Sequence, residues 1–466
     1  MGMGRRKADR QQEFWVPTQD LALAPRNVFY ERLNRLLAEA NFDAWVQEMC
    51  RDHYAKLGRD SIPPETFFRM LLIGYMEGID SQRGIAWRCA DSLSLKKFLG
   101  YAVQEETPDH SSMSRIRWRL PKEVFDEVFR LVLRIVNENG LLDAKTVGVD
   151  STTLEANAAM KSIVRKDTGE NWDAYLKRLA AEDGVEIKSK ADLIRYDKDR
   201  NDQGKKKVSN EVWESPTDPD ARIAKMKDGT THLAYKAEHV VDLETGVILA
   251  AEIYHANQGD TATLINSLTV AQENLDQADI IRDIEKVAAD KGYHKVELLA
   301  ECEQLGTFGT LTYIPEKDNR YQHTWEDKPP EQERAYRLNR ERTQRDYGKQ
   351  LQKKRSEMVE RTFAHLCETG GARRSWLRQI ENVAKRYLMQ AAAYNLGRVM
   401  RKLLGAGKPR EFWERRAAVF ALSAAVVSLW GALKRCLSRE NYGEPGLTTF
   451  STWSGEPVNA SRWPAA

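Results

Sequence analysis

Residues 146–152 read TVGVDST, and this stretch marks the point where the chain changes from purely helical to mixed structure. Its valines and threonines favour a short β-strand that ends on the carboxylate of Asp150. Before Gly140, apolar residues recur at three- and four-residue spacing, which is the pattern of helices with one buried face. After Gly140, strand-like and helical segments alternate. The sequence therefore predicts an all-α region followed by an α/β region.

The second half of the chain continues this alternation. Two strand-like runs are separated by the LETG tetrapeptide at 243–246, which is a hairpin signal. A short apolar run, VAAD at 287–290, ends on Asp290 in the same way that the earlier strand ends on Asp150. The remaining predictions are strands at 234–242, 247–254 and 310–314, helices at 261–275 and after Gly292, and a basic helical region at 330–404 with a break at Gly370-Gly371.

The helical region at 28–139 contains one short basic helix of special interest. The stretch at 107–120 begins with the capping residues Asp109 and Ser111. It then carries three arginines between apolar residues: Arg115, Arg117 and Arg119. A short basic helix after other short helices resembles the recognition half of a helix-turn-helix. The alternative is a solvated charged face on an ordinary helical bundle, and the sequence leaves both open.

Composition changes along the chain suggest domain boundaries. We predict a flexible N-terminus at 1–27, an all-α DNA-binding domain at 28–140, a catalytic domain at 141–405 and a helical, loose tail at 406–466. A Lys- and Asp-rich stretch at about 160–230 reads as a surface insertion in the catalytic domain. Residues 417–433 carry no charge, but this run falls short of a bilayer span and is rich in Ala and Ser. We expect a packed or partner-facing helix there, and no membrane contact.

The charge of the chain is nearly balanced, with 72 Lys plus Arg against 69 Asp plus Glu over 466 residues. This balance excludes a protein that coats nucleic acid by uniform positive charge. The balance is uneven, however, because residues 334–410 hold 20 basic and 6 acidic residues, a net charge of +14. The rest of the chain has a net charge of -11. We therefore expect a local, salt-sensitive DNA track.

The cysteines and histidines indicate neither disulfides nor zinc. The five cysteines are scattered and form no CxxC pair, so we predict no disulfide framework, no thiolate zinc site and a reducing, cytoplasmic location. Four histidines lie near the α/β motifs, namely His232, His239, His255 and His294. No two of them have metal-ligand spacing on a helix, and we predict no zinc site.

Two aspartates and one glutamate are the candidate catalytic groups. Asp150 and Asp290 each follow a short apolar strand, the position where open α/β sheets place working side chains. The alternative for either residue alone is an Asx turn or a helix cap. Glu360 lies on a basic helix beside an apolar stripe of Val359, Phe363 and Leu366, which would dock the helix on the sheet.

Carboxylates that converge in this way suit divalent metal chemistry. Asp and Glu oxygens are hard ligands that bind Mg²⁺ or Mn²⁺, and two such ions support in-line phosphoryl transfer. Glu357 competes with Glu360 for this role, but Lys353 and Arg361 lie four residues to either side and would hold it in a surface ion pair. We therefore favour Asp150, Asp290 and Glu360 as a two-metal site.

An ordered series of motifs resembles the insertion-sequence transposases of bacteria. Residues 63–117, with GYMEGIDSQR at 74–83 and PDHS at 108–111, are similar to the helical N-terminal domain of that family. Further motifs resemble its DDE catalytic domain: VDST at 149–152, YKAEH at 235–239, DLETG at 242–246, ADKGY at 289–293 and VERTFAH at 359–365. The resemblance extends to about Leu404.

This resemblance implies a ribonuclease-H-like mixed sheet, a divalent metal, and cleavage and joining of DNA. Asp150, Asp290 and Glu360 fall where the family carries its three catalytic carboxylates. It also implies double-stranded DNA partners, namely terminal inverted repeats and target DNA, a homodimer on DNA and a nucleoid-associated protein.

The chain departs from the family around the third carboxylate. Related transposases carry a Tyr, an Arg and a Lys at fixed spacings from it, whereas this chain has Lys353, Ser356 and Cys367 there. Arg355 is one position away from the family's arginine, and it or another arginine would have to replace that residue. The candidate DNA-binding arginines in this region are Arg355, Arg361, Arg373 and Arg374.

Three functions remain compatible with the sequence. The first is a cut-and-join DNA transposase. The second keeps the metal-dependent cleavage but does not join strands, which makes the protein a DNA nuclease. The third is a DNA-binding repressor or architectural protein without catalysis.

Overall fold

The computed structural model describes residues 27–439, apart from 56–60, 204–207, 227–228, 307–308, 318–324 and 327. Residues up to Trp413 form one compact unit and those from Glu414 onward a second. The flexible N-terminus predicted at 1–27 lies almost wholly outside the described residues, as does the end of the predicted loose tail.

The N-terminal part of the first unit is all-helical, as the sequence predicts. Short side-chain caps begin several of its helices: Ser81 accepts a hydrogen bond from the backbone of Gly84, and Asp109 accepts one from Ser111. Gly78 and Gly100 end two helices in the left-handed conformation. The helices are α1 (Asn27–Glu39), α2 (Phe42–Cys50), α3 (Pro64–Glu77), α4 (Gln82–Ala90), α5 (Leu93–Leu99), α6 (His110–Arg119) and α7 (Lys122–Glu138), with a 3₁₀ turn η2 (Arg51–His53).

A mixed six-stranded sheet follows and confirms the α/β prediction. Its order is β4-β5-β1-β7-β8, and β6 pairs with β5. The pairs that involve β5 are antiparallel, whereas β1 runs parallel to β7 and β7 parallel to β8. The strands are β1 (Thr146–Glu155), β4 (Arg222–Lys225), β5 (Thr231–Asp242), β6 (Ile248–His255), β7 (Lys286–Ala289) and β8 (Leu311–Tyr313).

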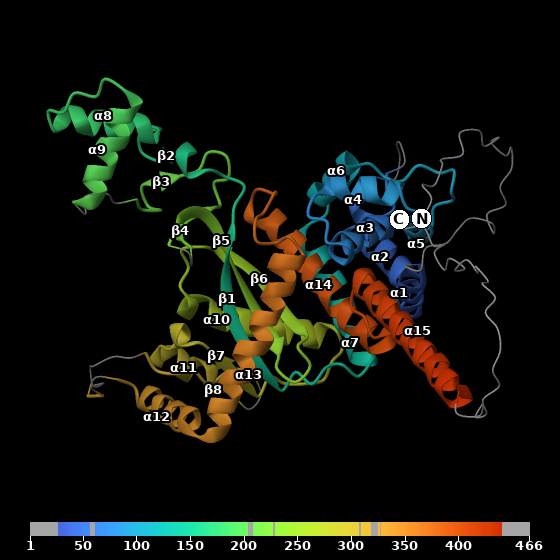
Figure 1. The fold of residues 1–466 in the computed structure, drawn as a ribbon. Coiled ribbons are helices and arrows are strands. Elements are labelled where there is room, and N and C mark those ends of the chain that lie inside the picture. Colours follow the sequence, from blue (N-terminus) through green and yellow to red (C-terminus); the bar gives the residue numbers. More distant parts are fainter. Residues whose placement is uncertain are drawn as a thin grey trace, which may run out of the picture. The chain divides into compact units, whose positions relative to one another are not determined.

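Helices cover the sheet, as Figure 1 shows. Helix α13 (Asp346–Phe363) packs on β1, β7 and β5, and α10 (Asp260–Gln277) packs on β5 and β6. Helix α14 (Ile380–Leu404) packs on β6, α3 and α7 and thereby joins the sheet to the helical region. The others are α11 (Val296–Cys302), α12 (Pro330–Gln344), the 3₁₀ turn η4 (Lys291–Tyr293) and the π-helical turn η5 (Ala364–Thr369).

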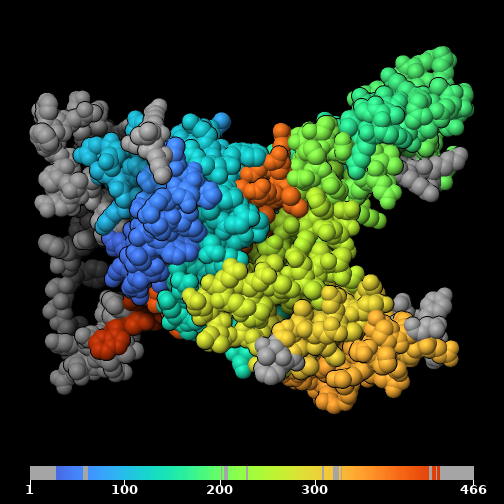
Figure 2. Space-filling model, turned by 180° about the vertical axis from the view of Figure 1, so that it is seen from behind, coloured from blue at the N-terminus to red at the C-terminus, as the bar shows by residue number. Residues whose placement is uncertain are grey.

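The helical region and the sheet lie against each other within the first unit. In Figure 2 the blue-to-teal surface of α1–α7 meets the yellow surface of the segment that contains α10, and α7 contacts both α10 and α14. The two share one apolar core, in which Phe125 and Val128 of α7 and Val399 of α14 are fully buried.

The predicted insertion has some structure of its own. Strands β2 (Val164–Arg165) and β3 (Trp213–Glu214) form a small separate sheet, and α8 (Trp172–Glu182) packs against α9 (Lys190–Asp202). A 3₁₀ turn η3 (Met160–Ser162) precedes them. Strand β4 lies within the predicted insertion range of 160–230 but pairs with β5, so the main sheet resumes near residue 222.

The uncharged segment at 417–433 is part of helix α15 (Pro409–Arg439). Several of its apolar side chains are exposed, namely Leu422, Val426, Leu429 and Trp430. Among the helices that the structure describes, none has both the length and the apolar character that a membrane span requires.

Candidate active site

Asp150 and Asp290 lie side by side where the pairing between the parallel strands β1 and β7 ends. The last register pair between β1 and β7 joins Val149 to Ala289, so the next residue of each strand is an aspartate. Asp290 stands at the start of η4, but its side chain makes no capping hydrogen bond there. The alternative role of Asp290 as a helix cap therefore does not describe its carboxylate. The register therefore brings together the two carboxylates that the sequence singled out.

The prediction that β1 ends near Asp150 is wrong. The strand continues to Glu155, because residues from Asp150 onward keep their antiparallel pairing with β5. What ends at Asp150 is the pairing with β7. Asp150 consequently lies within a rigid, continuous strand, at the point where the pairing of that strand with β7 ends.

A glycine brings α13 close to Asp150. A Cβ atom on Gly148 would lie 2.9 Å from Val359 Cγ2 and 3.0 Å from Arg355 Cγ, so only glycine admits the helix at this distance. Arg355 then reaches Asp150, and its Nη1 donates to Asp150 Oδ2 at 2.9 Å. The other carboxylate oxygen, Oδ1, accepts the backbone N–H of Ser151 at 2.8 Å.

Glu360 lies on the same helix, five positions after Arg355. Its side chain is exposed and accepts a hydrogen bond from Ser356 Oγ at 2.8 Å. Glu357 pairs with Arg361, in agreement with the surface ion pair that the sequence suggests. Within the described residues, no three or more His, Cys, Asp or Glu side chains are grouped so that they could hold a metal ion.

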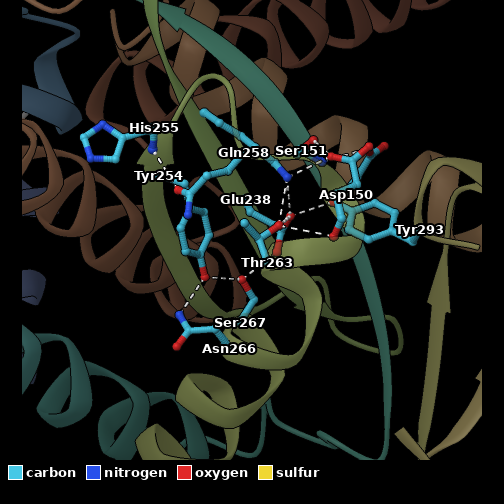
Figure 3. A network of polar contacts seen from close by, with 12 residues as sticks. Asp150, Ser151, Glu238, Tyr254, His255, Gln258, Thr263, Asn266, Ser267 and Tyr293 are labelled. Carbon is cyan, nitrogen blue, oxygen red and sulfur yellow. Dashed lines mark hydrogen bonds and ion pairs between the residues drawn. The ribbon is translucent and has the colours of Figure 1, made fainter. Parts of the chain in front are cut away.

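A buried polar network lies on the opposite face of the sheet and was not predicted from the sequence. Side chains alternate between the two faces of a strand, and Asp150 is paired with His239 whereas Ser151 is paired with Glu238. Glu238 is fully buried and accepts hydrogen bonds from Thr263, Ser267 and Tyr293, at 2.7, 2.6 and 2.8 Å. Figure 3 shows these groups converging on its carboxylate.

Lys236 balances the negative charge in this network. Its Nζ lies 3.1 Å from Glu238 Oε2 and 2.8 Å from Asp260 Oδ1, and Ser151 Oγ donates to that same Asp260 oxygen at 3.0 Å. A buried carboxylate with this many donors and a cation is compensated for the loss of water. Burial raises the pKa of Tyr293 well above its usual value, with the Glu238 charge adding to the effect. The phenol therefore stays a donor and fixes η4, next to Asp290.

The sequence contained a partial signal for this network. Lys236 and Glu238 belong to the YKAEH motif, and Tyr293 belongs to ADKGY. Lys236 and Glu238 are charged residues within a predicted strand, and charged residues in a buried strand need partners. What the sequence did not reveal is that Thr263 and Ser267 of α10 supply the donors.

Several predicted DNA-binding arginines lie along strand β1. Arg355 contacts Asp150, Arg373 Nη1 donates to Thr152 Oγ1 at 3.2 Å, and Arg374 Nε lies 3.7 Å from Glu155 Oε1. Arg361 pairs with Glu357, and Arg373 also pairs with Glu368 at 2.7 Å. The row of arginines comes from α13 and from the loop at 370–379, and it places positive charge along the strand that carries Asp150.

The three arginines of α6 do not share one surface. Arg115 and Arg119 are exposed, and Arg119 lies over the ring of Tyr54. Arg117 is buried, with 8% of its surface accessible, on the other side of the helix. A helix face that reads DNA would thus contain Arg115 and Arg119 but not Arg117.

His239 has a structural position, and His232, His255 and His294 are not grouped with it. His239 is fully buried, its Nδ1 lies 2.7 Å from Thr362 Oγ1 and its Nε2 lies 2.7 Å from Tyr387 OH. The imidazole therefore links β5 to α13 and α14. Burial lowers the pKa of His239 to about 3, so the ring is neutral at physiological pH.

Comparison with known families identifies both parts of the chain. Residues 19–119 match the family described as Transposase domain (DUF772), and residues 193–396 match the Transposase DDE domain. These two matches are consistent with an insertion-sequence DDE transposase. Together the two matches cover about two thirds of the chain. No curated protein and no solved structure matches the chain.

The DDE match implies a ribonuclease-H-like fold for the matched region, in agreement with the mixed sheet and its flanking helices. Asp290 and Glu360 lie inside the matched range, whereas Asp150 lies before it. The insertion at about 160–221 separates Asp150 from most of the matched region. The register between β1 and β7 is thus what connects Asp150 to the rest of the site.

Proposed function

We propose that this protein is a cut-and-join DNA transposase that binds transposon ends, cleaves DNA strands and transfers them to a target. The observation that carries the proposal is the pairing of Val149 with Ala289, which sets Asp150 and Asp290 next to each other at one sheet edge. The row of arginines along β1 supports it, because positive charge beside the carboxylates would hold a DNA backbone. The match to transposase families supports the same conclusion.

We propose Asp150, Asp290 and Glu360 as the ligands of Mg²⁺ or Mn²⁺, and because they are not grouped in this structure, Glu360 has to leave its hydrogen bond with Ser356 to join the two aspartates. Their oxygen donors suit these ions, and Asp290 and Glu360 are exposed. When bound, a pair of such ions would activate the attacking oxygen and stabilise the leaving one. Asp150 Oδ2 currently accepts the Arg355 guanidinium, so Arg355 has to release this oxygen when Asp150 takes a metal. We propose that Arg355 then pairs with a DNA phosphate.

Cleavage of an end-bearing duplex tests the proposal. The substrate is a duplex from the DNA that flanks the coding sequence, incubated with Mg²⁺ or Mn²⁺. We expect D150N, D290N and E360Q each to lower the cleavage rate at least about 100-fold, as loss of a metal ligand does. E357Q is the matched control, because Glu357 is exposed on the same helix and pairs with Arg361. Full activity in D150N or D290N would overturn the metal assignment.

Strand joining separates the transposase from a nuclease. A supercoiled target plasmid added to the same reaction gives joined products only if the free 3′ end attacks it. Cleavage without joining would establish the nuclease alternative, and tight end binding with neither reaction would establish the repressor alternative.

We also propose that the active form is a homodimer on DNA, because transposition requires two ends in one complex. Light scattering with and without end DNA measures this directly. A complex of one chain with one end that still joins strands would contradict it.

A further inference from the structure

A cavity lies between the N-terminal helices and the loop that follows η5. Its volume is about 330 Å³, at the lower end of the range for small-molecule sites. Residues of α3, α4, α6 and α7 line one side, and the loop and α14 line the other. In Figure 2 the darker orange segment emerges between the cyan helices and the green strands. The apolar part of the lining consists of Tyr75, Ile79, Phe125, Trp376, Leu377 and Met389.

One buried arginine in this cavity has two nitrogen donors without a hydrogen-bond partner among the described residues. Arg117 is 8% exposed, and its Nε and Nη1 donate to no acceptor among the described residues. A buried guanidinium normally uses its donors, because leaving them unpaired after removal from water is costly. The orphan donors of Arg117 therefore indicate a missing acceptor in the cavity.

A second arginine makes the cavity positive. Arg386 also lines it, and Nη2 of Arg386 donates to the backbone oxygen of Gly371 at 3.3 Å. Burial and, secondarily, the charge of Arg386 lower the pKa of Arg117 to about 10, so the two cations repel each other. Asp80 is the one carboxylate in the described lining, and its Oδ2 accepts the indole N–H of Trp376 at 3.0 Å. Two guanidinium groups and one carboxylate leave the cavity with a net positive charge.

The rest of the lining suits a base and a sugar. Trp376 is 49% exposed, and the guanidinium of Arg374 lies over its ring, 5.1 Å from the centroid, so a base would stack on the opposite face of the indole or in place of Arg374. Gln82 and Ser114 are hydrogen-bonded to each other at 2.6 Å and provide polar edge groups. Gln390 Oε1 is buried without a partner in the part of the chain that the structure describes. An unpaired acceptor beside unpaired donors matches a ligand that carries both kinds of group.

We propose that this cavity binds a phosphate-bearing nucleotide, with the phosphate on Arg117 and Arg386 and the base against Trp376. The nucleotide comes either from a DNA strand or from the free mononucleotide pool. The cavity is connected to the catalytic strand, because Ser375 N donates to Glu155 O at 2.8 Å and Asn157 Nδ2 donates to Trp376 O at 2.9 Å. Glu155 lies five positions after Asp150 on β1, about 16 Å along the strand. A DNA strand held in the cavity would thus be anchored near the strand β1 that carries Asp150.

Calorimetric titration of the full chain with deoxyadenosine monophosphate tests the proposal. We expect saturable one-site binding, weakened about tenfold or more in R117M and in R386M, because each variant loses a charged hydrogen-bond donor to the phosphate. R83M is the matched control, since Arg83 is exposed on α4 and is not among the residues that line the cavity, so this variant should bind as the parent does. D150N should also bind as the parent does, which separates this site from the proposed catalytic function.

The melting temperature distinguishes a binding role from a structural one. Arg117 has unpaired buried donors, so R117M should melt at the same temperature as the parent or higher, while it loses the nucleotide. Equal binding by the parent and R117M would overturn the proposal. Binding of inorganic phosphate with no gain from the base and sugar would overturn the nucleotide assignment.

The source of the ligand is resolved by competition. A single-stranded oligonucleotide that displaces the mononucleotide at lower concentration identifies a DNA strand as the ligand. A mononucleotide that the oligonucleotide does not displace identifies the free nucleotide.

Discussion

Acidification should destabilise this protein through one buried histidine. His239 lies between Thr362 and Tyr387 and stacks on the ring of Phe363, with ring centroids 4.1 Å apart. Neutral imidazole fits this environment because one nitrogen donates and the other accepts. Burial lowers its pKa from 6.5 to about 3. Protonation is therefore strongly disfavoured in the folded protein and easy in the unfolded chain.

The sign and size of the effect follow from linkage. Below pH 6.5 the unfolded chain binds a proton at His239 that the folded protein does not bind. The stability contribution is therefore complete above pH 6.5 and is lost as the pH falls from 6.5 towards 3. Between pH 8 and pH 5 the free energy of unfolding should fall by about 2 kcal/mol, and the full loss below pH 3 is about 5 kcal/mol.

Urea unfolding of the parent and of H239Q at pH 8, 7, 6 and 5 measures this contribution. All other titrating groups are common to the two proteins, so the difference in their free energies of unfolding isolates His239. The parent should be more stable at pH 8, and its advantage should narrow by about 2 kcal/mol at pH 5. H232Q controls for removing an imidazole from the same strand, because the His232 side chain is 39% exposed.

A difference that stays constant from pH 8 to pH 5 would refute this reasoning, because it would show equal proton binding in the folded and unfolded chains. A parent whose advantage grows at low pH would show that the imidazole is protonated in the folded state. That result would replace the neutral bridge between Thr362 and Tyr387 with a charged one.

Three further predictions concern the supports of the site and its chemistry. G148A should lower the free energy of unfolding by about 1–3 kcal/mol, measured by urea titration, because the new Cβ would lie 2.6 Å from Leu243 Cδ2 and 2.9 Å from Val359 Cγ2, and the second contact would push α13 away; an unchanged value would mean that the helix moves at no cost. D242N should lower the free energy of unfolding by roughly 2–3 kcal/mol in the same assay. Buried Asp242 accepts hydrogen bonds from the N–H groups of Asp143, Ala144 and Glu244, and an amide nitrogen cannot accept them. A variant as stable as the parent would contradict this account. Chelation with EDTA should abolish end cleavage, and excess Mg²⁺ should restore it; cleavage that persists in EDTA would contradict the divalent-metal assignment.

Local chemistry predicted much of the secondary structure. The LETG turn between β5 and β6, the short strand before Asp290 and the helix after Asp260 all appear near their predicted places. Side-chain periodicity and turn residues act over a few positions, so a linear sequence contains them. The length of β1 beyond Asp150 was missed, because the pairing partner that extends it lies about 80 residues away.

The candidate site could be predicted only in part from the sequence. Asp150 and Asp290 were found because each follows a short apolar run in the sequence, and the register then placed them together. Arg117 was predicted as a DNA-reading side chain because it alternates with Arg115 and Arg119. In the structure, however, the packing of α6 buries the Arg117 side chain, which lines a cavity. Alternation along a helix assigns a residue to a face, but only the neighbouring elements decide whether that face meets water.

The sequence by itself determined the class of the fold, the order of its elements and the carboxylates available for chemistry, since these depend on residue type and local spacing. The tertiary structure decided which groups meet. Only the packing of α13 on Gly148 placed Arg355 on Asp150, and only α10 supplied the hydroxyls that stabilise Glu238. Such contacts join residues far apart in the chain, and their geometry follows from the mutual packing of whole elements.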